Sequence, residues 1–342
     1  ETLQGGNQND IFEFGGAQTH SVLGGDDEDY FIFNAGASLT GTIDGQAGRD
    51  TLDYNAGSGG AYATSVALAL TGLGTTNGFA GTASNITGSF DNIGEIVGGS
   101  AIDSLAGLDV DSTWDVEIHP TFSRYTGSAR TLNFALIDTL LGGSAADRFD
   151  FVDNVTLSGN VDGNGGDDTL DFGDYTSVRN FALTVLGTTD GFDGTVNGLA
   201  LGFADINIIT GGSALDTLTG MDADSHWAIN TANAGIYTST NTLTFSAVDT
   251  LNGGSSADTF DFANAATLSG LVNGGNGTDV LDYADYTTTV TVDLSTGSAT
   301  GINGNNINGV SNVENITGGS AADSLKGDAG ANVITGNAGN DT

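Results

Sequence analysis

The sequence has no cysteine, one proline and only six basic residues among 342. The lack of cysteine fits cytosolic and secreted proteins alike, so it does not decide the compartment. The scarcity of lysine and arginine excludes nucleic acid as a direct partner, because phosphate binding requires basic clusters. It also argues against docking on an anionic membrane, and no apolar run is long enough for membrane insertion.

Acidic residues dominate instead, with 43 Asp and Glu giving a net charge of −37. Repulsion at this charge should destabilise a compact fold unless a divalent cation neutralises it. The hydrophobic content of 38% is nevertheless too high for a disordered acidic tail. Apolar residues alternate with polar ones in short strings such as 258–262 and 289–294, which predicts strands.

A long repeat of just over a hundred residues organises the chain. The sequence Gly98-Gly-Ser-Ala-Ile-Asp-Ser-Leu105 returns, with small changes, at 211–218 and 318–325. The predicted organisation is one continuous solenoid with two full units, at 98–210 and 211–317, a partial unit at 1–97 and the start of a further unit at 318–342. The chain begins without Met and ends inside a motif, so we expect an excerpt of a longer protein.

A short period of nine residues is nested in the long one. The pattern is G-G-x-G-x-D-x-U-x, where U is a large apolar residue, and Gly274–Leu281 fits it at every defined position. Six polar, glycine-rich residues form a turn, and x-U-x forms a short strand with one inward side chain. Such units must stack to bury their apolar residues. The sequence therefore predicts an all-β fold: a parallel β-solenoid (β-helix or β-roll) with coils of roughly 20 residues, forming an elongated rod.

The nonapeptide resembles the RTX, or haemolysin-type, calcium-binding repeat. The longer unit, including Leu281–Gly301 and Val313–Gly319, is similar to repeats of giant tandem-repeat bacterial surface proteins of the adhesin type. The resemblance implies Ca²⁺ bound between turns by the sixth-position Asp and by backbone carbonyls. It also implies export to the cell surface or the extracellular medium, often by type I secretion.

The resemblance and the acidic repeats together give a set of candidate calcium ligands. They are Asp10, Asp26, Asp29, Asp50, Asp109, Asp111, Asp168, Asp222, Asp224, Asp279, Asp323, Asp328 and Asp341. Ala or Ser replaces the fourth-position Gly in the G-G-S-A-x-D copies. There the alternative is that the Asp only caps a turn by accepting backbone N–H groups; it applies to Asp103, Asp147, Asp216, Asp258 and Asp323.

Two recurrent features leave alternatives open. Asp109 and Asp111, and likewise Asp222 and Asp224, either hold a cation or lie in a solvated turn. The aromatic residues that recur in both units either fill the core or form a sugar-binding or subunit-contact surface; they are Trp114, Trp227, Tyr125 and Tyr237.

Catalysis is not expected. His20, His119 and His226 share no metal-binding spacing, and the six basic residues are scattered rather than repeated, unlike those that bind acidic sugars. The predicted function is an extracellular structural solenoid that self-associates into a filament, sheath or layer. The alternatives are the extender of a secreted adhesin, with cell-surface or polysaccharide ligands, and an accessory module of a secreted enzyme.

Overall fold

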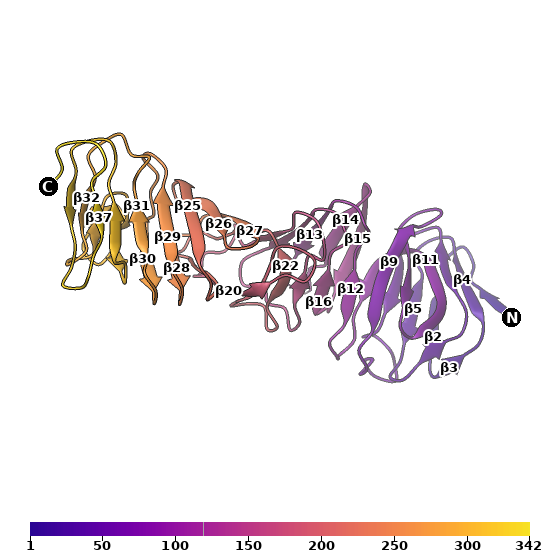
Figure 1. Cartoon of the computed structure of the whole chain (residues 1–342). Helices are drawn as coiled ribbons and strands as arrows, with labels where there is room; N and C mark the ends of the chain where they lie inside the picture. Colours follow the sequence, from indigo (N-terminus) through magenta and orange to yellow (C-terminus); the bar gives the residue numbers. More distant parts are fainter. Residues whose placement is uncertain (119) are drawn as a thin grey trace. The chain divides into compact units, whose positions relative to one another are not determined.

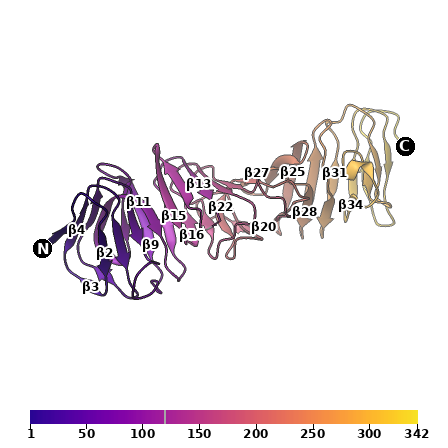
Figure 2. The same ribbon diagram turned by 180° about the vertical axis from the view of Figure 1, so that it is seen from behind.

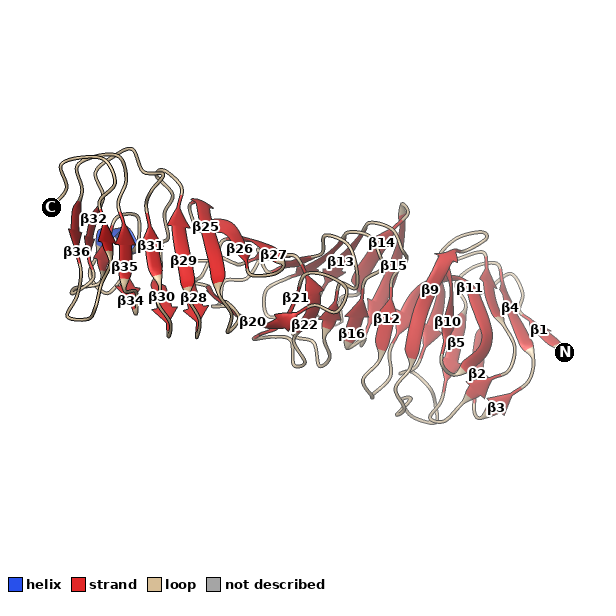
Figure 3. Cartoon of the chain, viewed as in Figure 1, coloured by secondary structure: helices blue, strands red, loops and turns tan. Residues whose placement is uncertain are grey.

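The computed structural model describes residues 1–118 and 120–342, so His119 lies outside the described residues. The chain forms two compact units: unit 1 comprises Glu1–Asp168 and Gly198–Gly202, and unit 2 comprises Thr169–Asn197 and Phe203–Thr342. Both consist of short strands and turns (Figure 3), and the described residues include one short 3-10 helix, η1 (Asn303–Asn305). The predicted all-β class is confirmed.

Unit 1 is a stack of coils whose equivalent strands pair in parallel and in register, as Figures 1 and 2 show from opposite sides. One column of strands contains β1 (Thr2–Gln4), β4 (Ser21–Gly25) and β7 (Ile43–Gln46), and a second contains β2 (Ile11–Phe14), β5 (Tyr30–Phe33), β8 (Asp50–Asp53), β11 (Ile86–Val97) and β15 (Arg130–Ala135). Further parallel pairs join β3 (Ala17–Gln18) to β6 (Ser38–Leu39), β12 (Ser104–Ala106) to β9 (Ala67–Leu73) and β16 (Thr139–Leu141), β16 to β18 (Val161–Asp162), and β13 (Ser112–Val116) to β17 (Asp147–Phe151).

The coils of unit 1 differ in length. Tyr30 pairs with Thr51 after a short coil, whereas Leu105 pairs with Leu140 after a markedly longer one. Longer coils contain an antiparallel meander, formed by β9, β10 (Phe79–Ala83) and β11, or by β13, β14 (Ser123–Gly127) and β15. The predicted coil length therefore holds for the short coils, and the meanders account for the longer ones.

Unit 2 repeats this architecture. Its first parallel column contains β19 (Thr169–Asp171), β23 (Ile208–Thr210) and β27 (Thr242–Ser246), and its second contains β20 (Asn180–Leu186), β24 (Thr217–Thr219), β28 (Thr250–Gly254), β30 (Val272–Gly275) and β34 (Val310–Ser311). The third column contains β25 (Ser225–Thr231), β29 (Asp258–Phe262), β31 (Val280–Asp282), β35 (Asn315–Thr317) and β37 (Ile334–Thr335). A further parallel pair joins β32 (Thr291–Asp293) to β36 (Ser324–Lys326). Antiparallel partners are β21 (Phe192–Val196) and β22 (Phe203–Ile206), β26 (Ala234–Thr238), and β33 (Ser298–Ala299).

The last coil of unit 2 is shorter than the others. Ile316 pairs directly with Ile334, so this coil contains two nonapeptides. Tandem nonapeptides thus place alternate repeats on the same side of the stack.

The core of each unit is a column of inward apolar residues at one position per strand. Phe31, Leu52 and Ile96 are register partners in three successive strands of unit 1, and all are fully buried. Trp114 stacks on Phe149 with ring centroids 5.6 Å apart, and the equivalent Trp227 on Phe260 at 5.7 Å. The side chains of Trp114, Trp227, Tyr125 and Tyr237 are all fully buried. These recurrent aromatic residues therefore fill the core and do not form an exposed sugar-binding or subunit-contact surface. None of the described residues forms a helix with the length and apolarity needed to cross a bilayer.

Candidate metal-binding turns

The sixth-position Asp is buried in most of the nonapeptide turns, and hydrogen bonds join it to the turn of the neighbouring coil. The backbone N–H of Asp10 donates to Asp29 Oδ1 (2.8 Å), and that of Asp29 donates to Asp50 Oδ1 (2.9 Å). In unit 2 the N–H of Asp258 donates in the same way to Asp279 Oδ1 (2.8 Å). Carboxylates therefore form a ladder between coils, which requires each turn to stack directly on the next.

The first glycine of each turn leaves room for this ladder. A Cβ built on Gly24 would lie 2.3 Å from Asp29 Oδ2 and 2.6 Å from the carbonyl oxygen of Gly45 in the next coil. On Gly253 it would lie 2.2 Å from Asp258 Oδ2 and 2.3 Å from the carbonyl oxygen of Gly274. Only Gly fits there. One carboxylate oxygen and one carbonyl oxygen thus pack closely against the first glycine, an arrangement that we call the cradle.

In one class of turn, which we call closed, the second Gly caps the carboxylate. The N–H of this Gly donates to Oδ2 of the sixth-position Asp at 2.5 to 2.7 Å, and the residue is not among those with positive φ. The capped residues are Asp103, Asp147, Asp216 and Asp323. Asp10 has the same bond from Gly6 (2.6 Å). The N–H bond that the capping alternative requires is therefore present at four of the five G-G-S-A-x-D copies.

In the other class, which we call open, Oδ2 is buried and has no hydrogen-bond partner. The second residue of these turns has positive φ: 134° at Gly25, 70° at Gln46, 152° at Gly254 and 99° at Gly275. The unpartnered oxygens belong to Asp29, Asp50, Asp258 and Asp279. Capping is therefore wrong for Asp258, which the sequence analysis did not include among the ligands. The sequence of the Asp258 turn is too similar to the sequences of the closed turns to show that this turn is open.

Burial shifts the ionisation of the open-turn carboxyls. Burial raises the pKa of Asp50 to about 7, and nearby carboxylates, Asp29 first among them, add to the shift. Burial likewise raises the pKa of Asp258 and of Asp279 to about 6. A buried carboxylate oxygen without a donor is destabilised in its charged form, and a cation beside it removes that penalty.

The cradle fits the oxygen chemistry that Ca²⁺ prefers. In the open turns, an unpartnered carboxylate oxygen and a carbonyl oxygen lie near the same glycine. Asp29, Asp50, Asp258 and Asp279 would supply the carboxylates. A bound Ca²⁺ would neutralise them and join the turns of two coils, while their Oδ1 atoms keep the inter-coil bonds with backbone N–H groups.

The remaining predicted ligands lie in different surroundings. Asp168 Oδ1 accepts the N–H of Asp147 (2.8 Å), and Asp341 Oδ1 accepts that of Asp323 (2.9 Å). Asp328 accepts the N–H of Gly330 and an amide hydrogen of Asn332. The exposed carboxylates are Asp26, Asp109, Asp111, Asp222, Asp224 and Asp328.

The structure brings some of these carboxylates near a buried one. Asp109 and Asp111 contribute to a raised pKa of Asp147, after burial, and Asp224 does so for Asp258. Among residues 1–118 and 120–342, no three Asp, Glu or His side chains converge on one point. Any cation in these turns must therefore draw much of its coordination from backbone carbonyls and water.

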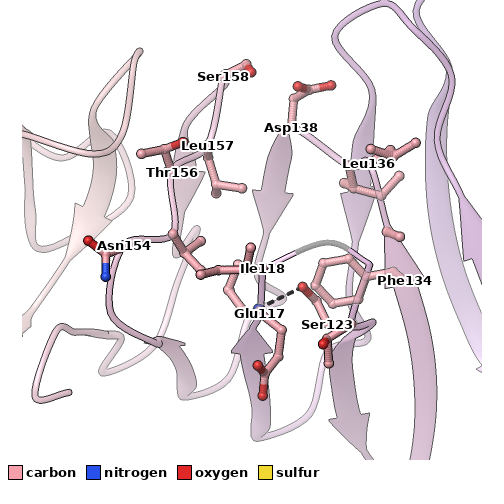
Figure 4. Close-up of a pocket in the computed structure, with 15 residues that line it drawn as sticks. Glu117, Ile118, Ser123, Phe134, Leu136, Asp138, Asn154, Thr156, Leu157 and Ser158 are labelled. Atoms are coloured by element: carbon pink, nitrogen blue, oxygen red, sulfur yellow. Dashed lines mark hydrogen bonds between the residues drawn. The ribbon is translucent and has the colours of Figure 1, made fainter. Parts of the chain in front are cut away.

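A cavity of about 260 Å³ lies apart from the turns, in unit 1 (Figure 4). Its walls include Ile118, Phe134 and Leu157, and the backbone N–H of Glu117 donates to Ser123 Oγ (3.0 Å) at its edge. In Figure 4, Asp138 lies toward the top of the view and the Glu117 carboxylate lies below Ile118. The cavity has walls of both polar and apolar residues.

The stacked turns define a calcium-type β-solenoid, and the comparisons with known proteins agree. The family model of the RTX calcium-binding nonapeptide repeat (4 copies) matches residues 308–342. Residues 308–342 thus carry RTX-type nonapeptide repeats, and such repeats bind Ca²⁺. The match covers the tandem nonapeptides at the end of unit 2. A search of curated proteins finds no match to this chain.

Proposed function

We propose that this chain is a structural protein of the bacterial exterior, a calcium-stabilised β-solenoid that self-associates into a filament, sheath or layer. The observation that carries the proposal is the set of buried, unpartnered carboxylate oxygens at stacked turns. In a chain of net charge −37, these turns favour folding only where cations are abundant. RTX repeats are typical of secreted proteins, and extracellular calcium-binding modules have dissociation constants of about 10⁻⁴ to 10⁻³ M.

We further propose that the chain is not an enzyme and that its partners are other copies of itself, cell-surface groups or polysaccharides. The basic residues support this, because they do not repeat with the unit. In the salt bridges described, Arg124 pairs with Asp115 and Glu117, Arg148 with Asp150 and Lys326 with Asp293. These cations neutralise acidic side chains of the chain itself rather than forming a common site.

Electron microscopy of the purified protein tests the proposal, first with millimolar Ca²⁺ and then with excess chelator. Ordered filaments or layers that dissolve on chelation are the expected result. Assemblies indifferent to chelator would contradict the calcium-dependent part of the proposal. Isolated monomers in both conditions would overturn self-assembly and favour the extender of a secreted adhesin or an accessory module of a secreted enzyme.

A further inference from the structure

One wall of the unit 1 cavity shown in Figure 4 recurs in unit 2 with the same sequence. Residues 156–159 and residues 267–270 both read Thr-Leu-Ser-Gly. A second wall recurs with the same backbone conformation, because Leu136 has φ of 54° and its equivalent, Ala247, has φ of 51°. The two sites can therefore be compared group by group.

The hydrogen bonds that fix the two walls recur as well. The N–H of the last glycine of each Thr-Leu-Ser-Gly sequence donates to the carbonyl oxygen of Asp138 in unit 1 and of Asp249 in unit 2, at 3.1 Å in both. The Oδ2 atom of Asp138 accepts the N–H of Asp103 (2.9 Å), and that of Asp249 accepts the N–H of Asp216 (2.8 Å). Each carboxylate is thus held through Oδ2, which leaves Oδ1 for the site between the walls.

In unit 2 a single residue, Asn233, occupies this site and bonds to both walls. Its N–H donates to the carbonyl oxygen of Thr267 (2.9 Å), and its carbonyl oxygen accepts the N–H of Val248 (3.1 Å). Its Oδ1 accepts the N–H of Ser269 (2.8 Å), and its Nδ2 donates to Ser269 Oγ (2.8 Å) and to Asp249 Oδ1 (2.7 Å). Ser269 Oγ also donates to Asp249 Oδ1. The backbone and the carboxamide of one asparagine therefore satisfy the polar groups of both walls.

In unit 1 the equivalent groups have no hydrogen-bond partner within residues 1–118 and 120–342. They are the N–H of Ile137, the carbonyl oxygen of Thr156, the N–H and Oγ of Ser158, and Oδ1 of Asp138. All four residues line the cavity, and Figure 4 shows Asp138 and Ser158 both toward the top of the view. The cavity thus presents the donors and acceptors that an asparagine residue satisfies in unit 2.

The difference arises in the hairpin that supplies Asn233. The same number of residues before the core tyrosine of the hairpin, unit 1 has Thr121 where unit 2 has Asn233. The N–H of Thr121 donates to the carbonyl oxygen of Ile118 in its own turn (3.0 Å) instead of to the cavity wall. Threonine also has no carboxamide, so it cannot supply the paired acceptor and donor of an asparagine side chain.

From this comparison we infer that the unit 1 cavity is a peptide-binding site, which takes an asparagine residue of a partner polypeptide. The carboxamide oxygen would accept the N–H of Ser158, and the carboxamide nitrogen would donate to Asp138 Oδ1. The main chain of the same residue would bond to Ile137 and Thr156. The inference goes beyond the proposed function, because it requires neither calcium nor self-assembly.

The size and charge of the cavity define its specificity. Its volume of about 260 Å³ lies below the roughly 300–1,000 Å³ of typical ligand pockets, which suits one residue rather than a larger ligand. Phe134 and Leu157 supply apolar surface for the rest of that residue. An aspartate in the peptide would place a second carboxylate against Asp138, so the site should reject it.

Nuclear magnetic resonance spectroscopy of the full chain tests the inference with a capped peptide of residues 231–235, acetyl-Thr-Ala-Asn-Ala-Gly-amide. We expect saturable shifts of the Ile137 and Ser158 amide signals. A second peptide with aspartate in place of the asparagine should leave these signals unchanged. The absence of shifts with the asparagine peptide, or an equal response to both peptides, would overturn the inference.

An Asp138→Asn variant should reverse this preference. Its amide oxygen can keep the bond to the Asp103 N–H, while its Nδ2 presents a donor to the cavity in place of an acceptor. The variant should therefore bind the aspartate peptide roughly tenfold more tightly than the asparagine peptide. Calorimetric titration measures both affinities, and an unchanged preference in the folded variant would contradict the inference.

The repeat also provides a matched pair of serine variants. Ser158→Ala should weaken binding of the asparagine peptide roughly three- to tenfold, the contribution of a single hydrogen bond. Ser269→Ala should leave it unchanged, because Asn233 already occupies the equivalent site in unit 2. Far-UV circular dichroism checks that both variants fold, and equal losses of affinity would show that the peptide does not bind in the unit 1 cavity.

Discussion

The sixth-position aspartates share burial but differ in the contacts of their two oxygens. Asp103 accepts the N–H of Val66 (2.7 Å) on Oδ1 and that of Gly99 (2.5 Å) on Oδ2. Asp50 accepts only the N–H of Asp29, on Oδ1, and its Oδ2 is unpartnered. Because a buried charge requires compensating donors, the two N–H groups offset part of the cost of burying the Asp103 carboxylate, whereas more of that cost remains at Asp50 until a cation binds.

Chemically identical substitutions at these two positions should therefore have opposite effects. Without calcium, Asp50→Asn should raise the free energy of unfolding by about 1–3 kcal/mol, because it removes an uncompensated buried charge. Asp103→Asn should lower it by about 1–3 kcal/mol, because the new amide hydrogens face an N–H donor.

Urea denaturation in calcium-free buffer measures both effects. With millimolar Ca²⁺, the free energy of unfolding of the Asp50→Asn variant should no longer exceed that of the unmodified chain. A change of the same sign in both variants without calcium would contradict the distinction between open and closed turns.

At the scale of elements, the strands depend on how closely the turns approach one another. In β28 and β30, Leu251 pairs with Val272 and Gly254 with Gly275, so the parallel ladder continues from the strand into the turn. The first glycine lies where the carboxylate of its own turn and a carbonyl of the next coil converge. A side chain there would separate the two coils.

Gly24→Ala should destabilise unit 1 by about 1–3 kcal/mol, the usual cost of overpacking, because its Cβ would meet Asp29 Oδ2 and the Gly45 carbonyl. Gly15→Ala is the matched control, since nothing lies within 4 Å of its added Cβ and its φ is not positive. We expect the control to be neutral or slightly stabilising. Thermal unfolding followed by circular dichroism compares the two, and equal melting temperatures would disprove the cradle.

Stacking was easier to predict from the sequence than the meanders that lengthen some coils. The nine-residue pattern of turns and short strands predicted the stacked coils of roughly 20 residues. The strands β14 and β15 turn at Ser128 and Ala129, with φ of 51° and 62°. Such a turn usually carries Asn-Gly or Asp-Gly, so this hairpin has no sequence signal.

The candidate site was predicted only in part for a different physical reason. Asp29, Asp50 and Asp279 were among the expected ligands, and each has an unpartnered oxygen. Asp258 was not, because the choice between open and closed states depends on the φ of Gly254 rather than on a residue type. A glycine adopts either state at little cost, so the sequence does not determine which occurs.

For the whole molecule, charge links stability to pH. Repulsion among 43 acidic residues grows as they ionise, and the open turns bury several of them. The folded pKa of Asp50, about 7, exceeds its usual unfolded value near 3.9, so the folded state holds more protons between these limits. Asp258 and Asp279, with pKa values of about 6, act in the same direction.

Without calcium, the free energy of unfolding should therefore fall as pH rises from about 4 to 7, by a total on the order of a few kcal/mol. Calcium should reverse the trend, because Ca²⁺ competes with protons for the same oxygens and binds better as pH rises. Urea denaturation at pH 5 and pH 7.5, with and without Ca²⁺, measures this. A variant with Asn at positions 50, 258 and 279 should show a weaker dependence, and stability that rises with pH in calcium-free buffer would refute the prediction.

The long coils also have a mechanical consequence. Leu105 and Leu140 are separated by a whole meander in sequence, yet they are adjacent rungs of one ladder, about 4.8 Å apart. Pulled straight, the chain between them would span about 120 Å. A tensile load that opens one such coil would thus extend the chain to roughly 25 times the length that the folded coil contributes along the stack. The meanders would therefore store chain length that is released only under load.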